Sequence, residues 1–300
     1  MCEKPRGLVN SNVKALKAGL IDSVAAIPTM TEEYKANEYY RQAQRFVYPL
    51  YKKDGMGGFS FSSTATFATY KGRFFCIFAA HALTADEETV ENIGMLTTDG
   101  NFVPLSVSCK AYKIYRDHDI VICISDTPFE PRNHFNLAPR ESATEFNTEG
   151  FGWIGFPQKK AVQTIHKSKA SPDKIINHLS VASDGRPVWS NAKFLMIGAM
   201  LESKSESVII GRFENVGVNY EYEGFKQQGY SPRGMSGGAL FYGPKKFHST
   251  PQSLEDLFLF AGIGLEYDRI SIKGVPKERI ISLIEEMLKL EADQSNGAPS

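Results

Sequence analysis

The chain has 300 residues, 42% of them hydrophobic, and its 34 basic residues are balanced by 34 acidic residues. A chain of this length can bury a substantial core, as one large domain or as two lobes, without a metal or disulfide framework. Its zero formal net charge gives no electrostatic reason to expect a nucleic acid or an anionic membrane as a partner. No stretch approaches the roughly 18 uninterrupted apolar residues of a membrane-spanning helix, so we expect a soluble protein.

The first thirty residues lack the sustained apolar run of a secretory signal, because lysines and an aspartate interrupt every candidate stretch. The four cysteines show no close pairing such as C-x-x-C, and three of them lie in apolar, strand-like runs. They are Cys2, Cys76, Cys109 and Cys123. Buried free thiols fit a reducing compartment, so we expect a cytoplasmic protein.

Residues 1–50 are predicted to form a partly helical N-terminal extension, with a capping-box start at Thr29 to Glu32. After it the sequence changes to short runs rich in β-branched and aromatic residues. Lys71-Gly72 and Asp99-Gly100 supply tight turns between such runs. In the first half these runs predict strands at 59–70, 73–80, 92–98, 101–108, 109–115 and 119–125.

The second half of the sequence also contains short strand-like runs, but their pattern is less regular. Short strands with tight turns favour an antiparallel sandwich or barrel over a parallel sheet. The chain is therefore predicted to be mostly β, with a first lobe at 51–135 and a second at 136–275. Strands of the second lobe are expected within 148–157, 161–168, 193–201, 207–213, 216–222, 238–243 and 257–267.

A C-terminal helix is predicted at 276–292. Pro276 sits near its first turn, and Ile280, Ile284 and Leu288 fall on one helical face. The polar residues 293–300 are predicted to be a disordered tail.

The run Ser231-Pro-Arg-Gly-Met-Ser-Gly-Gly-Ala-Leu240 encloses Ser236 between glycines, directly before a strand-like segment. Glycines permit a tight, exposed turn, which could aim the amides of Gly234 and Ser236 at the developing charge of a tetrahedral intermediate. The run also fits the G-x-S-x-G turn of α/β-hydrolases, which requires a following helix and a downstream acid and histidine. The next residues are not helical, and no acid separates Ser236 from the only downstream histidine, His248. A base must therefore come from upstream.

His81 ends an apolar run and is flanked by alanines, in A-A-H-A. An isolated histidine is more often a core or turn residue, but the serine turn makes His81 the candidate general base. Asp119 directly precedes the apolar run I-V-I-C-I, where a carboxylate must be hydrogen-bonded to stay ionised. A histidine N–H is a suitable donor. Asp117 is a competing candidate, but only Asp119 adjoins the apolar run.

The order His, Asp, Ser, with A-A-H-A, D-I-V-I and G-M-S-G-G-A-L, resembles the trypsin-like peptidase family, whose motifs run T-A-A-H, D-I-A-L and G-[DN]-S-G-G-P-L. The resemblance covers roughly residues 55–275. It implies a chymotrypsin-like double antiparallel β-barrel, with six strands in each perpendicular barrel. His81 and Asp119 would lie on the first barrel and Ser236 on the second.

The resemblance implies a serine endopeptidase acting on a polypeptide substrate. Ser236 would attack the peptide carbonyl while His81 takes its proton and Asp119 fixes the histidine tautomer. The amides of Gly234 and Ser236 would form the oxyanion hole, and the acyl-enzyme would then be hydrolysed. No cofactor is required, and the histidine spacing shows no H-E-x-x-H or comparable zinc motif.

The family resemblance also suggests substrate-binding residues. The strand at 257–267 looks like the family's strand that pairs with substrate backbone, which would place Gly264, Leu265 and Glu266 at the substrate. By family spacing, the floor of the specificity pocket is at 236 minus 6, Tyr230. A tyrosine there argues against a deep pocket for Lys or Arg, although Glu266 or Asp268 could supply an acidic group instead.

Some residues depart from the family pattern. Met235 replaces the acidic residue that precedes the nucleophile in digestive members, so activation by a freed N-terminus is not expected. Ala82 replaces the family's cysteine after the histidine. These departures favour intracellular, bacterial members over secreted zymogens. They also support an alternative, in which the fold is a protein-binding module or cleaves only when assembled with an activator. A regulatory protein docking on the N-terminal extension is a further hypothesis.

Overall fold

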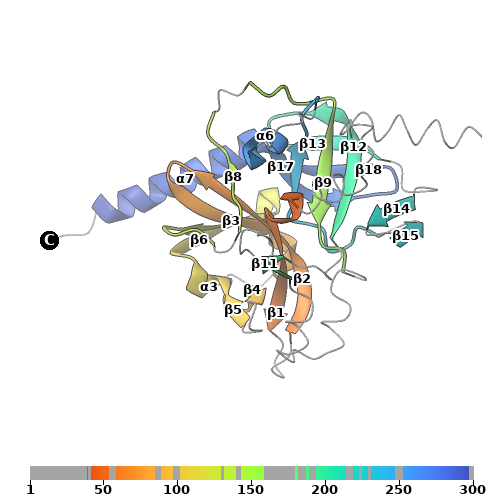
Figure 1. The fold of residues 1–300 in the computed structure, drawn as a ribbon. Helices are drawn as coiled ribbons and strands as arrows, with labels where there is room; N and C mark the ends of the chain where they lie inside the picture. Colours follow the sequence, from red (N-terminus) through yellow and green to blue (C-terminus); the bar gives the residue numbers. More distant parts are fainter. Residues whose placement is uncertain are drawn as a thin grey trace, which may run out of the picture.

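The computed structural model of this chain describes residues 39, 42–53, 59–84, 89–96, 102–129, 132–139, 143–158, 180–181, 187–188, 194–213, 219–222, 225–228, 231–246 and 253–296. The described part is mostly β and forms two lobes, the lower one orange and yellow and the upper one green to blue in Figure 1. Within these ranges, no helix has the length and apolar character needed to span a membrane.

The first lobe is an eight-stranded sheet in the order β5-β4-β1-β2-β3-β7-β6, with β8 added in parallel to β2. Its two edge strands, β5 and β6, are joined only by residues 105–110, so the sheet curls back toward itself. The strands are β1 (Val47–Lys53), β2 (Phe59–Tyr70), β3 (Arg73–Ala79), β4 (Ile93–Leu96), β5 (Phe102–Pro104), β6 (Ala111–Tyr115), β7 (Ile120–Ser125) and β8 (Phe135–Asn136).

The closed six-stranded barrel expected for this lobe is not formed among the described strands, because β5 and β6 do not pair. The strand predicted at 101–108 ends at Pro104, and α3 (Leu105–Ser108) makes a helical turn there. Proline has no backbone N–H to continue a strand ladder. The sheet is therefore open at this point.

The second lobe is a closed six-stranded antiparallel barrel in the order β12-β13-β18-β17-β16-β9, as expected for this lobe. Two short strand pairs and α6 (Leu254–Leu257) lie between the barrel strands in the sequence. The strand predicted at 161–168 lies outside the described residues. The barrel strands are β9 (Gly150–Gly155), β12 (Leu195–Lys204), β13 (Ile209–Arg212), β16 (Gly238–Tyr242), β17 (Leu259–Tyr267) and β18 (Ser271–Pro276). The short strand pairs are β10 (Ser180–Val181) with β11 (Pro187–Val188), and β14 (Asn219–Tyr222) with β15 (Phe225–Gln228).

Several boundaries differ from those that the sequence predicts. Strand β1 begins at Val47, within the residues assigned to the N-terminal extension, and β8 spans the predicted division between 135 and 136. Strand β18 was not predicted, since Ser271–Pro276 is short and contains both Gly and Pro. The C-terminal helix α7 runs over Lys277–Asn296, beyond the predicted end at 292. The rest of the predicted tail and residues 1–38 of the extension lie outside the described residues.

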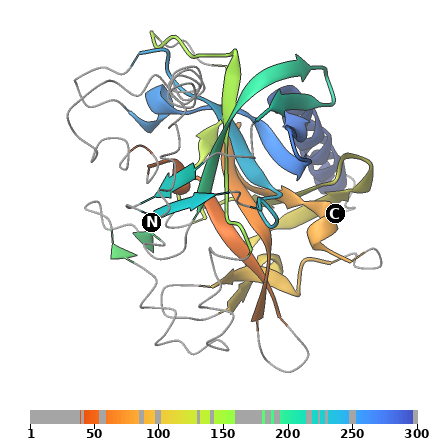
Figure 2. The ribbon, with the colours of Figure 1, turned by 90° about the vertical axis from the view of Figure 1, so that its right-hand side faces the viewer.

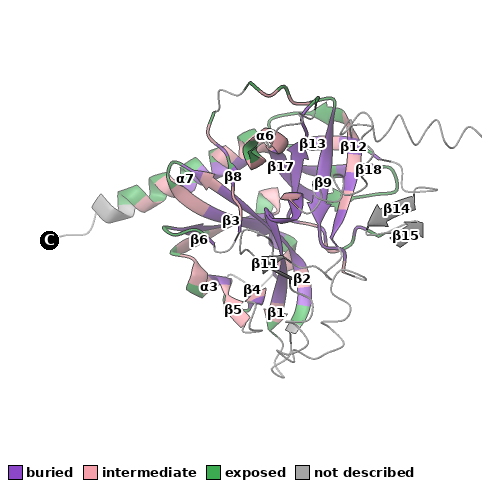
Figure 3. Ribbon diagram, in the orientation of Figure 1, coloured by how far each residue is buried: buried purple, intermediate pink, exposed green. Residues whose placement is uncertain are grey.

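A shared apolar core joins the lobes, and Figure 3 shows the central strands of both as buried. Aromatic rings cross the junction: Phe46 stacks on Phe135 with ring centroids 4.1 Å apart, and Phe135 lies 5.1 Å from Phe260 of β17. Phe258 completes the cluster by packing 5.7 Å from Phe46 and 5.2 Å from Phe241. Burial of such rings contributes both apolar area and ring–ring attraction, so it favours a fixed arrangement of the two lobes.

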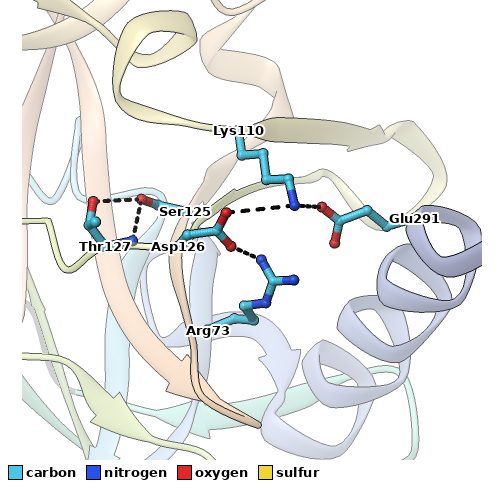
Figure 4. A network of polar contacts seen from close by, with 6 residues as sticks. All are labelled: Arg73, Lys110, Ser125, Asp126, Thr127 and Glu291. Carbon is cyan, nitrogen blue, oxygen red and sulfur yellow. Dashed lines mark hydrogen bonds and ion pairs between the residues drawn. The ribbon is translucent and has the colours of Figure 1, made fainter. Parts of the chain in front are cut away.

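Helix α7 lies beside both lobes, as the two ribbon views show (Figures 1 and 2). Its apolar face is buried through Ile280, Leu283 and Ile284, and the Tyr115 hydroxyl donates to the Leu283 carbonyl at 2.7 Å. At the surface, the Lys110 ammonium lies 2.9 Å from Glu291 of the helix and 3.6 Å from Asp126 (Figure 4). Exposed ion pairs of this kind contribute little free energy, so the apolar face accounts for most of the docking.

The lobes are also connected by hydroxyl groups of β2. Thr64 and Thr66 are fully buried, and their side chains donate to the carbonyls of Gly234 at 3.0 Å and Gly237 at 2.8 Å. Thr64 Oγ1 additionally accepts from the Phe156 amide at 2.9 Å. Since buried polar groups are costly without partners, these bonds tie the residues around Ser236 to a strand of the first lobe.

We predict that Thr64→Val destabilises the protein by about 1–3 kcal/mol, because the isosteric valine leaves the Phe156 amide and the Gly234 carbonyl buried without this partner. Thr64→Ser is the matched control, since it keeps the hydroxyl and should lose much less. Urea-induced unfolding of the three proteins measures the difference. Equal stability of Thr64→Val and wild type would show that these hydrogen bonds do not contribute to holding the two lobes together.

Candidate active site

His81 lies in η1 (Ala80–Ala82), the single turn that follows β3. The pairing of Ala79 with Ile120 brings the end of β3 next to the start of β7, where Asp119 is found. His81 Nδ1 is 2.5 Å from Asp119 Oδ2, and the His81 side chain is 51% exposed. The two side chains that the sequence pairs are therefore in contact, with the imidazole at the surface of the site.

Asp119 adopts a left-handed backbone conformation, with φ 52° and ψ 39°, between η2 (Arg116–His118) and β7. This conformation is uncommon outside glycine, although Asp and Asn tolerate it better than most residues. It lets Asp119 hold η1 at three points: its carbonyl accepts from Ala80 N at 2.9 Å, Oδ1 accepts from His81 N at 2.7 Å, and Oδ2 contacts the imidazole. Asp117 is exposed in η2 and makes none of these contacts.

Arg116 also helps to hold the η1 turn that carries His81. Its guanidinium donates to the Ala80 carbonyl and to the Thr84 carbonyl, each at 3.0 Å. These two carbonyls flank His81 in the chain, so the histidine turn is held by both a carboxylate and a guanidinium. This role of Arg116 was not predicted, although the residue stands three positions before Asp119 in R-D-H-D.

Ser236 lies in the turn between Ser231 and β16, which follows it as a strand and not as a helix. The amides of Met235, Gly237 and Gly238 are used within or next to the turn, donating to Pro232, Gly264 and Met235 carbonyls respectively. Among the hydrogen bonds of the described residues, the amides of Gly234 and Ser236 are not donors. These two N–H groups, which are two residues apart in the chain, therefore remain available to a ligand.

Two glycines of this turn cannot be replaced without strain. Gly234 has φ +98°, and a Cβ there would lie 2.5 Å from the Phe61 ring. Gly237 has φ +85°, and a Cβ there would lie 2.1 Å from the Thr64 carbonyl and 3.0 Å from the Ala79 amide. Positive φ favours glycine. The residue after Ser236 thus packs against the end of β3, two residues before His81.

The Ser236 hydroxyl donates to the Leu265 carbonyl at 2.6 Å. Leu265 is the extra residue of a β-bulge, since Gly264 pairs with Gly274 and Glu266 pairs with Lys273. A bulge interrupts the ladder and redirects the backbone, which here leaves the Leu265 carbonyl to accept from the serine. In this conformation the Ser236 proton is directed at β17 and not at the imidazole.

The remaining predicted residues fall into two groups. Gly264, Leu265 and Glu266 lie beside the Ser236 turn: Gly264 accepts from the Gly237 amide at 2.8 Å, and Glu266 is exposed. Tyr230, predicted as the pocket floor, lies outside the described residues. No cluster of three or more His, Cys, Asp or Glu side chains suited to a metal ion occurs within the described ranges.

The pKa of His81 is raised above its ordinary value of 6.5. The hydrogen bond with Asp119 is the main cause; partial burial opposes it, and the charges of Asp119 and Glu266 add to it. Because the folded-state pKa is higher, protonated His81 stabilises the fold fully below the unfolded pKa of about 6.5. That contribution is lost as the pH rises through the folded pKa.

Comparison of the sequence with protein-family models and with curated protein sequences gave no match.

We predict that Glu266→Gln lowers the pKa of His81, because it removes a negative charge that favours the imidazolium. Asp119→Asn should lower it further, since it removes the larger cause. Titration of the imidazole resonances by NMR measures both changes. Glu206→Gln, which alters an exposed carboxylate that is not a cause of the shift, is the control. A pKa that is the same in Glu266→Gln and wild type would contradict the arrangement described here.

Proposed function

We propose that this protein is a serine endopeptidase with a chymotrypsin-like architecture, in which Ser236 is the nucleophile, His81 the general base and Asp119 the group that orients the histidine. The observation that carries the proposal is the contact of Asp119 with His81 Nδ1 beside a glycine turn that presents a serine. A histidine that donates from Nδ1 to a carboxylate keeps Nε2 as a proton acceptor. This is the tautomer that a general base requires.

The backbone of the serine turn supports the same chemistry. Attack of Ser236 Oγ on a carbonyl carbon forms a new C–O bond and places negative charge on the carbonyl oxygen, while the hydroxyl proton passes to His81. The amides of Gly234 and Ser236 would receive that charge, since they donate to no other group among the described hydrogen bonds. The proton on His81 then goes to the leaving amine, and water hydrolyses the acyl-enzyme by the same route.

A peptide could bind as an added strand along β17. Strand β16 pairs with β17 only as far as Gly264, whereas β18 covers Glu266 and Tyr267 from the other side. Among the described strands, residues 265–267 therefore have a neighbour on one side only. An extended segment placed there would use main-chain hydrogen bonds for affinity. An amide N–H of that segment would compete with Ser236 for the Leu265 carbonyl and so favour rotation of Ser236 toward His81.

The bond from Ser236 to Leu265 also favours a second candidate function. If the serine keeps this partner, the fold would serve as a protein-binding module or would become a protease only with an activator. The two candidates differ in one property, the reactivity of the Ser236 hydroxyl in the isolated protein.

We predict that a fluorophosphonate probe labels Ser236 in the wild-type protein, because the probe needs both an activated hydroxyl and donors for the phosphoryl oxygen. His81→Ala should slow labelling by about a hundredfold or more, as expected when a general base is removed. Mass spectrometry of the labelled peptide distinguishes Ser236 from the nearby Ser231. Ser205→Ala, on an exposed turn of the second lobe, is the control and should label normally.

Absence of labelling, both for the isolated protein and in the presence of cell extract as a source of activator, would overturn the peptidase proposal in favour of the binding module. Labelling that appears only with the extract would support the partner-activated form.

A further inference from the structure

The first turn of helix α7 contacts the short η2 segment that directly precedes Asp119. The guanidinium of Arg279 donates from Nη2 to His118 Nε2 at 2.5 Å, and His118 is the last residue of η2. Arg279 is the third residue of α7. The C-terminal helix therefore touches the residue next to the candidate acid of the active site.

A second contact holds the other end of η2. Tyr115, the residue before η2, is buried, and its hydroxyl donates to the Leu283 carbonyl of α7 at 2.7 Å. The helix thus holds η2 at both ends, through Tyr115 and His118. Asp119 follows directly with its left-handed backbone conformation, and such a conformation persists in a residue other than glycine only where the surrounding structure enforces it. The two contacts with α7 supply part of that restraint.

The two lobes contribute opposite sides of the Arg279–His118 contact. Helix α7 follows β18 without a break, and β18 pairs with β13 and β17 in the barrel of the second lobe. The η2 segment lies between β6 and β7 of the first lobe. The second lobe, which carries Ser236, therefore also sets the position of the side chain that holds the end of η2.

The chemistry of the pair decides which group donates. An arginine side chain has only donors, so His118 Nε2 must be the acceptor, and this requires a neutral imidazole with its proton on Nδ1. The Nη1 group of Arg279 donates to Ser282 Oγ at 3.5 Å, which keeps the guanidinium on the surface of the helix. A side chain at position 118 that has no acceptor would lose the contact with α7.

Resting on the function proposed above for the role of His81, we propose that Arg279 is a positioning residue, which holds η2 through His118 so that Asp119 stays against the His81 imidazole. Arg279 acts through His118 and needs no contact with the substrate. Loss of this hold should let Asp119 relax from its left-handed conformation and weaken its contact with His81.

Titration of the His81 imidazole by NMR tests this, because the hydrogen bond with Asp119 is the main cause of its raised pKa. Arg279→Gln and His118→Leu should each lower that pKa toward 6.5. Loss of the guanidinium charge alone would raise it, so a fall reports the changed geometry. The double variant should match either single variant, since all three lack the same contact. His118→Gln keeps an acceptor oxygen for Arg279 and should stay near wild type.

Glu285→Gln is the control for a general loosening of the helix. It removes another contact of α7 with the first lobe, in which the Glu285 carboxylate accepts from Lys71 at 2.7 Å and from Tyr70 at 2.8 Å. It should leave the pKa of His81 unchanged. Urea-induced unfolding shows which variants are folded, and His118→Leu carries the test if Arg279→Gln does not fold.

Fluorophosphonate labelling of Ser236 in the same preparations separates this inference from the peptidase proposal. Arg279→Gln and His118→Leu should slow labelling by about tenfold or more, as expected when a catalytic group is misplaced. A lower pKa of His81 in a protein whose Ser236 never labels would support the role of Arg279 and contradict only the peptidase function.

The inference itself would be overturned by a pKa of His81 that is unchanged or raised in Arg279→Gln and His118→Leu, even where Ser236 labels normally. It would also be overturned if Glu285→Gln lowered the pKa by as much as Arg279→Gln does, because the loosened helix would then be the cause.

Discussion

Two buried threonine hydroxyls on β2 bond the serine turn of the second lobe to the first lobe, which carries the histidine. Thr64 and Thr66 reach from the first sheet to carbonyls of the turn, and the Thr64 amide donates to the Ser236 carbonyl at 3.0 Å. The turn can approach β2 this closely only because Gly237 has no side chain. Leaving a buried polar group without its partner costs about 1–3 kcal/mol of stability. These hydrogen bonds therefore fix the position of the two lobes in addition to the apolar packing between them.

The position of His81 depends on a different feature, the left-handed backbone conformation of Asp119. That conformation directs both the carbonyl and the carboxylate of Asp119 to η1, so one residue holds the position of the histidine backbone and the orientation of its ring. The Arg116 guanidinium also bonds to this turn, through the carbonyls of Ala80 and Thr84. His81 and Asp119 are therefore in contact in this structure, whereas the Ser236 hydroxyl donates to the Leu265 carbonyl.

The sequence predicted much of this because its signals are local. The runs at 59–70 and 73–80 carry alternating and apolar patterns that mark strands, and the structure has β2 and β3 there. The pairing of His81 with Asp119 followed from the position of His81 at the end of one apolar run and of Asp119 directly before another. The sequence did not reveal Thr64 and Thr66, because a threonine in a strand is ordinary until its partner is known, although hydroxyl residues within a buried strand were a usable signal.

Features that depend on contacts between distant parts of the chain could not be predicted from the sequence. The opening of the first sheet depends on whether the turn after Pro104 lets β5 reach β6, and the bulge at Leu265 depends on the register with β18. Neither has a local pattern. The burial of Met235 is also a long-range feature. Its side chain is fully buried, so the position before Ser236 serves packing here, where the family that the sequence resembles has an acid.

The proposed peptidase function requires that the Ser236 turn form an oxyanion site that faces His81. A crystal structure of the protein after reaction with a fluorophosphonate tests it most directly. We expect a phosphorus–Oγ bond at Ser236, with Oγ no longer hydrogen-bonded to the Leu265 carbonyl. The phosphoryl oxygen should lie about 2.7–3.1 Å from the Gly234 and Ser236 nitrogens. A phosphoryl oxygen that points into solvent, with both amides unused, would contradict it.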